Sequence, residues 1–197
     1  METAISLIVL LFSIILHEIA HGYVAKIFGD DTAEKAGRLT LNPAPHIDMF
    51  GSIILPALLV LSHSSVVLGW AKPVPVNYNK LRNPKKDMIW VSLAGIATNI
   101  CIAIICSIVF HITHNAFIRL ICVYGVLYNL FLASFNLIPI PPLDGSRVVS
   151  GLLPPAQAYK YNQIEPYGIL VIFLLMYMGM FKYVLYIVSP LFKLLLG

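Results

Sequence analysis

Residues 3–28 read TAISLIVLLFSIILHEIAHGYVAKIF, an apolar run interrupted only by His17, Glu18, His21 and Lys26. A helix needs about 20 mostly apolar residues to cross the hydrocarbon core of a bilayer, so this run is long enough to span it. No basic segment precedes the run, and His17 and Glu18 stand where a signal-peptide cleavage site would lie. We therefore expect a permanent membrane helix here and not a cleaved signal peptide.

The composition of the whole chain extends this expectation. The 197 residues are 59% hydrophobic and 11% charged, whereas a soluble domain has about 25% charged residues. The mean hydropathy is +0.85. The net charge of +4 is concentrated in a basic loop between apolar segments. This placement favours the positive-inside bias of membrane proteins over binding to nucleic acid.

Five further apolar segments follow the first. They are residues 49–71, 88–118, 120–143, 166–181 and 183–196. The pattern predicts an all-α polytopic membrane bundle with about five membrane segments, within a range of about four to six. We expect a single membrane-embedded domain over residues 1–197, with a catalytic core at about 3–150 and C-terminal helices at about 164–196.

Segment 49–71 presents a topological conflict. If the first helix runs from outside to inside, loop 29–48 is cytoplasmic, and a complete crossing by 49–71 would leave the basic loop 72–87 outside. This arrangement breaks the positive-inside bias. A re-entrant segment, interrupted near Pro56 or at the polar patch Ser62-His63-Ser64-Ser65, removes the conflict, and such backbone is tolerated where protein or a water cavity surrounds it. We therefore favour a re-entrant 49–71.

The sequence His17-Glu18-Ile19-Ala20-His21 forms an HExxH pattern inside the first helix. Positions i and i+4 share one helix face, so both imidazoles can reach one metal ion. Glu18 is next to the first ligand, where a carboxylate can take a proton from a metal-bound water. Ionisable groups within a membrane helix are costly, and metal coordination compensates for that cost. A solvated helix end is the alternative interpretation.

A catalytic zinc ion usually has three protein ligands and an open position for water. Asp144 is the candidate for the third ligand, because it ends the apolar, proline-rich run of residues 134–143. Proline breaks the helix, so the chain can turn a carboxylate inward, and Gly145 permits a tight turn behind it. The alternative is that Asp144 caps the following helix at the membrane surface.

Together these motifs resemble those of the site-2 protease family of intramembrane zinc metalloproteases. Residues 136–145 read NLIPIPPLDG and match the family pattern NxxPxPPLDG. Residues 69–77, GWAKPVPVN, resemble a loop of short bacterial members that have no PDZ domain. Residues 92–99, SLAGIATN, resemble a GxxxN segment, although Ile96 stands where many members have proline. The likeness covers roughly residues 10–150.

The resemblance implies one zinc ion (Zn2+) per chain, bound by His17, His21 and Asp144, with Glu18 as the general base. It also implies hydrolysis of a peptide bond in or near a transmembrane helix of a membrane protein substrate. This is the reaction of regulated intramembrane proteolysis. The expected location is the lipid bilayer of a bacterial inner membrane, with the active site towards the cytoplasm. Asn99 and Asn136 would contact the substrate backbone or the oxyanion; interhelical hydrogen bonding is the alternative for both.

Two other functions compete with proteolysis. A non-enzymatic membrane metal-binding protein or transporter would use the same ligands but has no need for Glu18 beside His17. Transporters also often contain internal repeats, and the sequence has no recognisable repeat. A catalytically silent relative is disfavoured because His17, Glu18, His21 and Asp144 are all present. The oligomeric state and the identity of the substrate stay open at this level.

Overall fold

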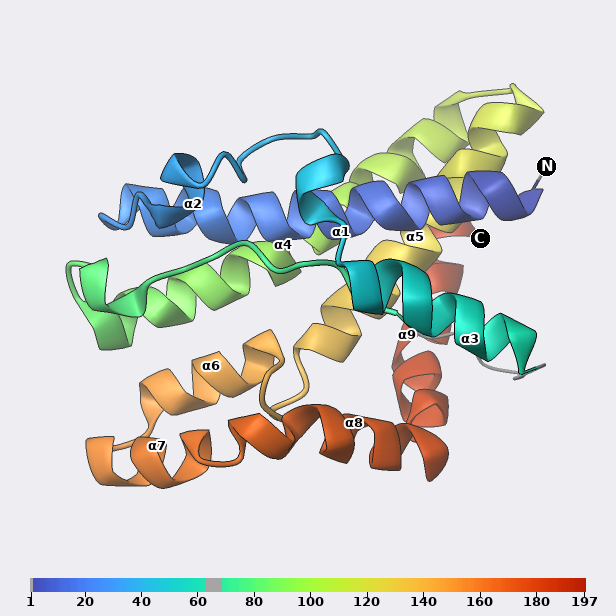
Figure 1. The fold of residues 1–197 in the computed structure, drawn as a ribbon. Helices are drawn as coiled ribbons and strands as arrows, with labels where there is room; N and C mark the ends of the chain where they lie inside the picture. Colours follow the sequence, from blue (N-terminus) through green and yellow to red (C-terminus); the bar gives the residue numbers. More distant parts are fainter. Residues whose placement is uncertain (1, 63–68) are drawn as a thin grey trace.

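Three long helices form the centre of the molecule. A computed structural model describes residues 2–62 and 69–197, and within these ranges the regular elements are helices, with no strand. Helices α1 (Glu2–Ile27), α4 (Pro84–Ile112) and α5 (Ala116–Asn136) are long and apolar enough to cross a membrane. All three pack against one another (Figure 1). The predicted all-α membrane bundle is therefore confirmed.

The shorter elements surround this centre. They are α2 (Thr32–Lys35), η1 (Ala44–His46), η2 (Met49–Ile54), α3 (Leu55–Leu61), η3 (Tyr78–Lys80), α6 (Asp144–Leu152), α7 (Pro155–Asn162), η4 (Glu165–Tyr167), α8 (Gly168–Tyr177) and α9 (Phe181–Leu196). The C-terminal helices bend by 75° at a short break between Tyr177 and Lys182. By length and composition the described chain has three spanning helices, or four if this bent pair counts as one.

Local sequence signals set the helix boundaries. The apolar segment 88–118 contains the short connection between α4, which ends at Ile112, and α5, which begins at Ala116. The Asn115 side chain accepts hydrogen bonds from the amides of Phe117 and Ile118, which is N-capping of α5. At the other end, α5 stops at Asn136, ahead of the proline cluster, because proline cannot continue a helix.

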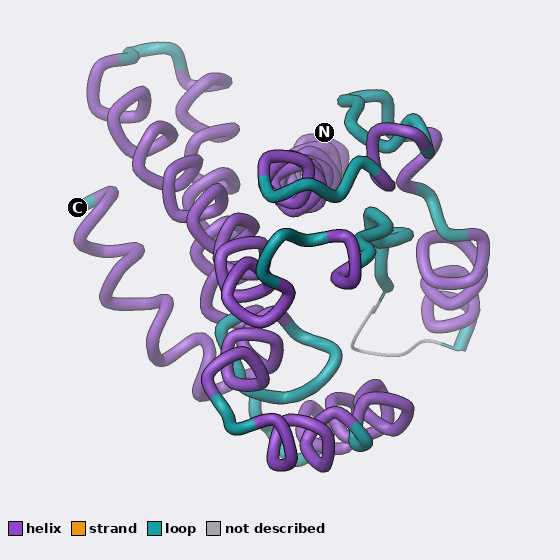
Figure 2. Tube along the Cα trace, turned by 90° about the vertical axis from the view of Figure 1, so that its left-hand side faces the viewer, coloured by secondary structure: helices purple, strands orange, loops and turns teal. Residues whose placement is uncertain are grey.

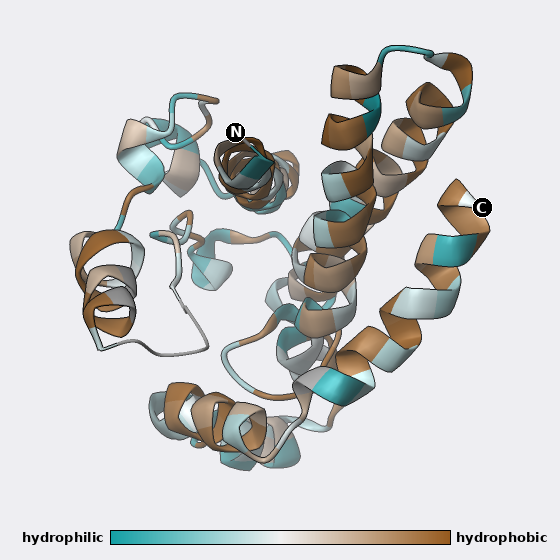
Figure 3. Ribbon diagram, turned by 90° about the vertical axis from the view of Figure 1, so that its right-hand side faces the viewer, coloured by the Kyte–Doolittle hydropathy of each residue, from teal (hydrophilic) through white to brown (hydrophobic). Residues whose placement is uncertain are grey.

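A small hydrophobic core joins α4, α5 and α9. Ala103 of α4, Val126 and Leu130 of α5, and Val184 and Val188 of α9 are all buried in it. Hydrophobic residues also cover much of the outward surface of these helices (Figure 3). This distribution is expected of a bundle whose solvent is lipid, because apolar side chains gain nothing from leaving the bilayer.

Segment 49–71 returns to its starting point. The Trp70 amide donates to the Gly51 carbonyl at 3.1 Å, and the Lys72 amide donates to the His46 carbonyl at 2.9 Å. The two ends of the segment therefore meet, as a re-entrant arrangement requires and a crossing helix does not (Figures 1 and 2). Residues 63–68, which include His63, lie outside the described part of the chain.

Candidate metal centre

His17, His21 and Asp144 converge on one point. Helix α1 presents both histidines from one face, and α6 presents Asp144 from its first turn. The Nε2 atoms of His17 and His21 lie 3.0 Å apart. The Asp144 Oδ2 atom lies 3.2 Å from the first and 3.3 Å from the second. The structure thus brings together the three residues that the sequence pattern selects as ligands.

Helix α4 holds the two imidazole rings through their other nitrogens. His17 Nδ1 lies 3.1 Å from Asn99 Oδ1, and His21 Nδ1 lies 2.7 Å from the Val91 carbonyl oxygen. Both partners are acceptors, so each Nδ1 carries the proton and donates it. Each Nε2 is then left with a lone pair that faces the centre. Outer partners of this kind orient metal-ligating histidines and increase their basicity.

The donor set fits a zinc ion. Two unprotonated Nε2 atoms and the Asp144 Oδ2 face one another, and Oδ2 has no hydrogen-bond partner among the described residues. Three lone pairs in contact repel unless a cation lies between them. Zinc–ligand bonds of about 2.0–2.1 Å at the tetrahedral angle separate two ligand atoms by about 3.3–3.4 Å. The measured separations of 3.0–3.3 Å match this spacing.

Gly95 lets α4 approach the histidines closely. A Cβ atom at this position would lie 2.5 Å from His17 Cε1 and 2.5 Å from His21 Nε2. Those distances are too short for any side chain, so glycine is required by the contact itself. Val91, Gly95 and Asn99 are spaced at i, i+4 and i+8 and form the face of α4 behind the metal ligands.

The end of α5 positions Asp144. Leu143 occupies the N-cap position of α6, and no side-chain capping hydrogen bond is present there. Asp144 is the first residue of α6, so its carboxylate is turned to the histidines and is not the cap. A Cβ atom on Gly145 would collide with the carbonyl oxygens of Leu137 and Ile138. Gly145 is therefore needed for close packing on the end of α5, which is a different reason from the turn expected from the sequence.

Glu18 is held by the extended segment 69–77. Its Oε2 atom accepts a hydrogen bond of 2.7 Å from the Val74 amide. Further along the segment, the Asn77 amide donates to Asp30 Oδ2 at 2.6 Å. The segment thus runs beside α1 and fixes one oxygen of the carboxylate that follows the first histidine. The sequence pattern does not reveal this contact, because the two residues are 56 positions apart.

The two asparagines occupy different environments. Asn99 is fully buried and contacts His17, and its Nδ2 has no partner among the described residues. This contact is an interhelical hydrogen bond, the alternative left open by the sequence. Asn136 Nδ2 donates to the Leu132 carbonyl oxygen of its own helix at 3.0 Å. Among the described contacts, none joins Asn136 to the three converging side chains.

Tyr78 adds a polar group that the sequence pattern does not assign to the site. Its ring packs beside the cluster that contains Val91, and the Arg147 guanidinium lies 5.5 Å from the ring centroid. Burial raises the pKa of the Tyr78 hydroxyl, Arg147 opposes this rise, and the Asp144 and Glu18 carboxylates add to it. The phenol therefore stays protonated beside the site.

Comparisons with known proteins identify the family of the chain. The model of peptidase family M50 matches residues 111–179, which include Asp144. The protein named "Putative zinc metalloprotease YwhC" from Bacillus subtilis is 39% identical over 91% of this chain and 83% of its own length. The protein named "Zinc metalloprotease MJ0392" from Methanocaldococcus jannaschii is 28% identical over 79% of this chain but only 36% of its own length.

A third relative, named "Putative zinc metalloprotease Rip2" from Mycolicibacterium smegmatis, is 31% identical over 84% of this chain and 64% of its own length. The chain therefore spans most of YwhC and a smaller part of the other two. No solved structure matches the chain. The family model, these relatives and the apolar helices together show that the chain is an integral membrane protein of peptidase family M50, the site-2 protease family, and a zinc-dependent peptidase.

Proposed function

We propose that this chain hydrolyses a peptide bond in or near a transmembrane helix of a membrane protein substrate, as in regulated intramembrane proteolysis. His17, His21 and Asp144 hold the zinc ion, and Glu18 is the general base. The observation that carries the proposal is the convergence of three acceptor atoms at 3.0–3.3 Å, two of them on the spanning helix α1 and the third on α6. One unit over residues 1–197 supplies the whole site.

The chemistry follows from these positions. Bound zinc lowers the pKa of its water towards about 7 and polarises the scissile carbonyl. Glu18 takes the proton from the water and returns it to the leaving amine. Because the Val74 amide holds Oε2 of Glu18, Oε1 is the oxygen that we assign to proton transfer. No acyl-enzyme is required.

The depth of the ligands supports cleavage within the membrane. His17 is preceded by 15 helical residues of α1, which begins at Glu2, and a rise of 1.5 Å per residue places it about 22 Å from the start of the helix. About ten residues of α1 remain beyond it. The site therefore lies inside the span, nearer the C-terminal end of α1, where a substrate helix must unwind locally to expose its amides.

The basic segment 72–87 supports an orientation of the protein in the membrane. The Arg82 amide donates to the Phe28 carbonyl at 3.0 Å, so the later part of the basic segment 72–87 lies at the C-terminal end of α1. The basic residues beside this contact or in the first turn of α4 are Lys80, Arg82, Lys85 and Lys86. The positive-inside bias assigns this end to the cytoplasm. We therefore infer an active site that opens towards the cytoplasmic face of a bacterial inner membrane.

Glu18→Gln tests the proposal directly. The purified variant is expected to retain one zinc ion per chain and to cleave membrane-helix peptides about 10²–10⁴-fold more slowly, because the general base is lost. Glu34→Gln is the matched control, since Glu34 is exposed and pairs with Lys26 outside the site. Zinc content by atomic spectroscopy and peptide cleavage by mass spectrometry are measured on the same samples.

Three results would overturn parts of the proposal. Unchanged cleavage by Glu18→Gln would remove Glu18 from the mechanism. Full zinc occupancy in Asp144→Ala would remove the third ligand. If the wild-type chain binds zinc but cleaves no peptide in a broad panel of membrane helices, the substrate class is wrong.

A further inference from the structure

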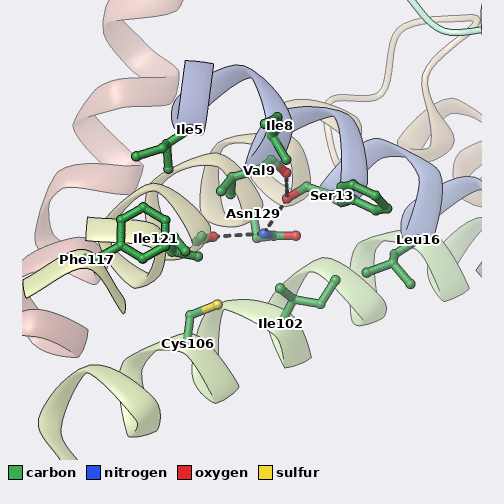
Figure 4. Close-up of a pocket in the computed structure, with 12 residues that line it drawn as sticks. Ile5, Ile8, Val9, Ser13, Leu16, Ile102, Cys106, Phe117, Ile121 and Asn129 are labelled. Carbon is green, nitrogen blue, oxygen red and sulfur yellow. Dashed lines mark hydrogen bonds between the residues drawn. The ribbon is translucent and has the colours of Figure 1, made fainter. Parts of the chain in front are cut away.

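A cavity lies beside the N-terminal part of α1. It has a volume of about 340 Å³ and lies between α1, α4 and α5 (Figure 4). On α1 its walls come from the face that carries Ile8, Phe12 and Leu16. The two histidines lie further along α1 towards its C-terminal end, with His17 one helical turn beyond Ser13. The cavity contains none of the residues assigned to catalysis.

The walls are apolar except at the base, where Ser13 and Asn129 meet. The Asn129 Nδ2 atom donates to Ser13 Oγ at 2.8 Å and to the Gly125 carbonyl at 2.8 Å. Ser13 Oγ in turn donates to the Val9 carbonyl at 2.8 Å. These bonds link α1 to α5 and use both protons of the amide.

The orientation of the Asn129 amide is fixed by these contacts. The Gly125 carbonyl can only accept a hydrogen bond, so the atom facing it is the nitrogen. Asn129 is 0% exposed, and its Oδ1 has no hydrogen-bond partner among the described residues. Figure 4 shows Oδ1 directed away from both bonded partners, into the space between α1 and α4. An unpaired buried acceptor is costly, and a ligand that donates one hydrogen bond would remove that cost.

The mouth of the cavity faces the hydrocarbon of the bilayer. Ile8 and Phe117 line the cavity and are 55% and 54% exposed, and both lie in spanning helices. A molecule that enters here must already be dissolved in the membrane. The volume is at the lower end of that of small-molecule sites and far too small for a helix about 10 Å wide.

We propose that this cavity binds a lipophilic alcohol: an alkyl or isoprenoid-like body with a single hydroxyl group. The body fills the apolar walls, and the hydroxyl donates to Asn129 Oδ1. A charged headgroup is excluded because the apolar lining offers it no partner. A pure alkane is disfavoured because it leaves Oδ1 of Asn129 unpaired. This site is independent of the proposed proteolysis.

The experiment compares 1-nonanol with n-decane, two probes with equal numbers of heavy atoms. The full chain is placed in phosphatidylcholine nanodiscs, and its Tm is measured against the mole fraction of each probe in the bilayer, since a ligand that binds the folded state raises Tm. We expect 1-nonanol to bind about tenfold more tightly than n-decane, because one hydrogen bond satisfies a buried acceptor. In Asn129→Leu this ratio is expected to fall to about one.

Ile121→Phe provides a second variant that retains Asn129. Ile121 lines the cavity, so the larger ring is expected to abolish the rise in Tm with either probe. Ile118→Phe is the control, because Ile118 lies on the same helix and outside the cavity. Equal binding of both probes by the wild type would overturn the proposal. So would 1-nonanol binding that survives in Ile121→Phe as fully as in Ile118→Phe.

Discussion

At the scale of single residues, Gly95 is the position where α4 leaves room for the two histidines by having no side chain. A Cβ atom there would lie 2.5 Å from His21 Nε2, one of the atoms assigned to zinc. We therefore expect Gly95→Ala to push the ring aside and to weaken zinc affinity about 10–100-fold, the range seen when an outer partner of a metal ligand is lost. Competition with a coloured zinc chelator measures this affinity.

Ala97→Val is the control for the glycine substitution. Ala97 lies on the exposed side of the same helix, so added volume there meets lipid and not the histidines. Zinc affinity in this variant should equal that of the wild type. If Gly95→Ala also binds zinc as tightly as the wild type, the contact between α4 and the two rings is looser than the structure indicates.

Asn99 gives the second prediction at this scale. Asn99→Leu removes the acceptor of His17 Nδ1–H and leaves a buried donor unpaired, which costs about 1–3 kcal/mol. Zinc affinity should fall about tenfold or more, and Asn99→Asp, which keeps an oxygen at the site, should recover part of it. Wild-type zinc affinity in Asn99→Leu, together with a raised KM, would instead favour direct contact with substrate.

The sequence supports the prediction of the ligands but not of their surroundings. The i, i+4 spacing of His17 and His21 places both on one helix face wherever that helix packs, and a lone carboxylate after a proline-broken span is conspicuous. The roles of Val91 and Gly95 depend on which face of α4 meets α1. The sequence of an apolar helix does not show which face packs against another helix, because lipid and protein interiors are both apolar.

At the scale of elements, the extended segment 69–77 links the re-entrant region to Glu18, the proposed general base. Val74→Pro removes the amide that donates to Glu18 Oε2 without adding charge. Because the carboxylate is no longer fixed, we expect kcat to fall about tenfold while zinc affinity is unchanged. Measuring cleavage of a membrane-helix peptide alongside zinc stoichiometry separates the two effects.

Val74→Ala is the matched variant, because it also shortens the buried side chain but keeps the amide proton. Its kcat should stay near that of the wild type. Equal losses in the alanine and proline variants would assign the effect to packing against α1 and not to the hydrogen bond with Glu18.

Element boundaries were predictable where a chemical signal marks them. The proline cluster correctly predicts the end of α5, whereas no charged residue marks the start of α5 at Ala116, which depends on Asn115 as a cap. The C-terminal segments, expected as one further span and a short or interfacial helix, form a bent pair that qualifies as a candidate span only when both halves are taken together. Hydropathy reports apolar composition and does not report bends.

At the scale of the whole molecule, the closed ends of segment 49–71 bring two loops to one end of the bundle. Lys80 Nζ lies 3.2 Å from Asp31 Oδ1, which joins loop 72–86 to the connection after α1. The turn between α4 and α5 lies at the other end of α4, away from α2 (Figure 1). Basic residues then gather on one side of the membrane, and the topological conflict noted in the sequence disappears.

Single cysteines test this arrangement in cells. The native Cys101, Cys106 and Cys122 are first replaced by alanine, and one cysteine is then introduced at an exposed position. Lys35→Cys and Lys86→Cys should be protected from a membrane-impermeant maleimide in intact cells and labelled after permeabilisation, because both lie at the basic end, which the proposed orientation assigns to the cytoplasm.

His114→Cys, in the α4–α5 turn, should show the reverse and react in intact cells. The decisive comparison is between positions 35 and 86, which flank segment 49–71 in the sequence. If the segment crosses the membrane, one of them must be labelled from outside while the other is protected. Such a result would separate loop 72–86 from the end of α1 and, with it, the Val74 amide from Glu18. Matching accessibility at 35 and 86, opposite to that at 114, is therefore required for the proposed catalytic geometry to exist in the membrane.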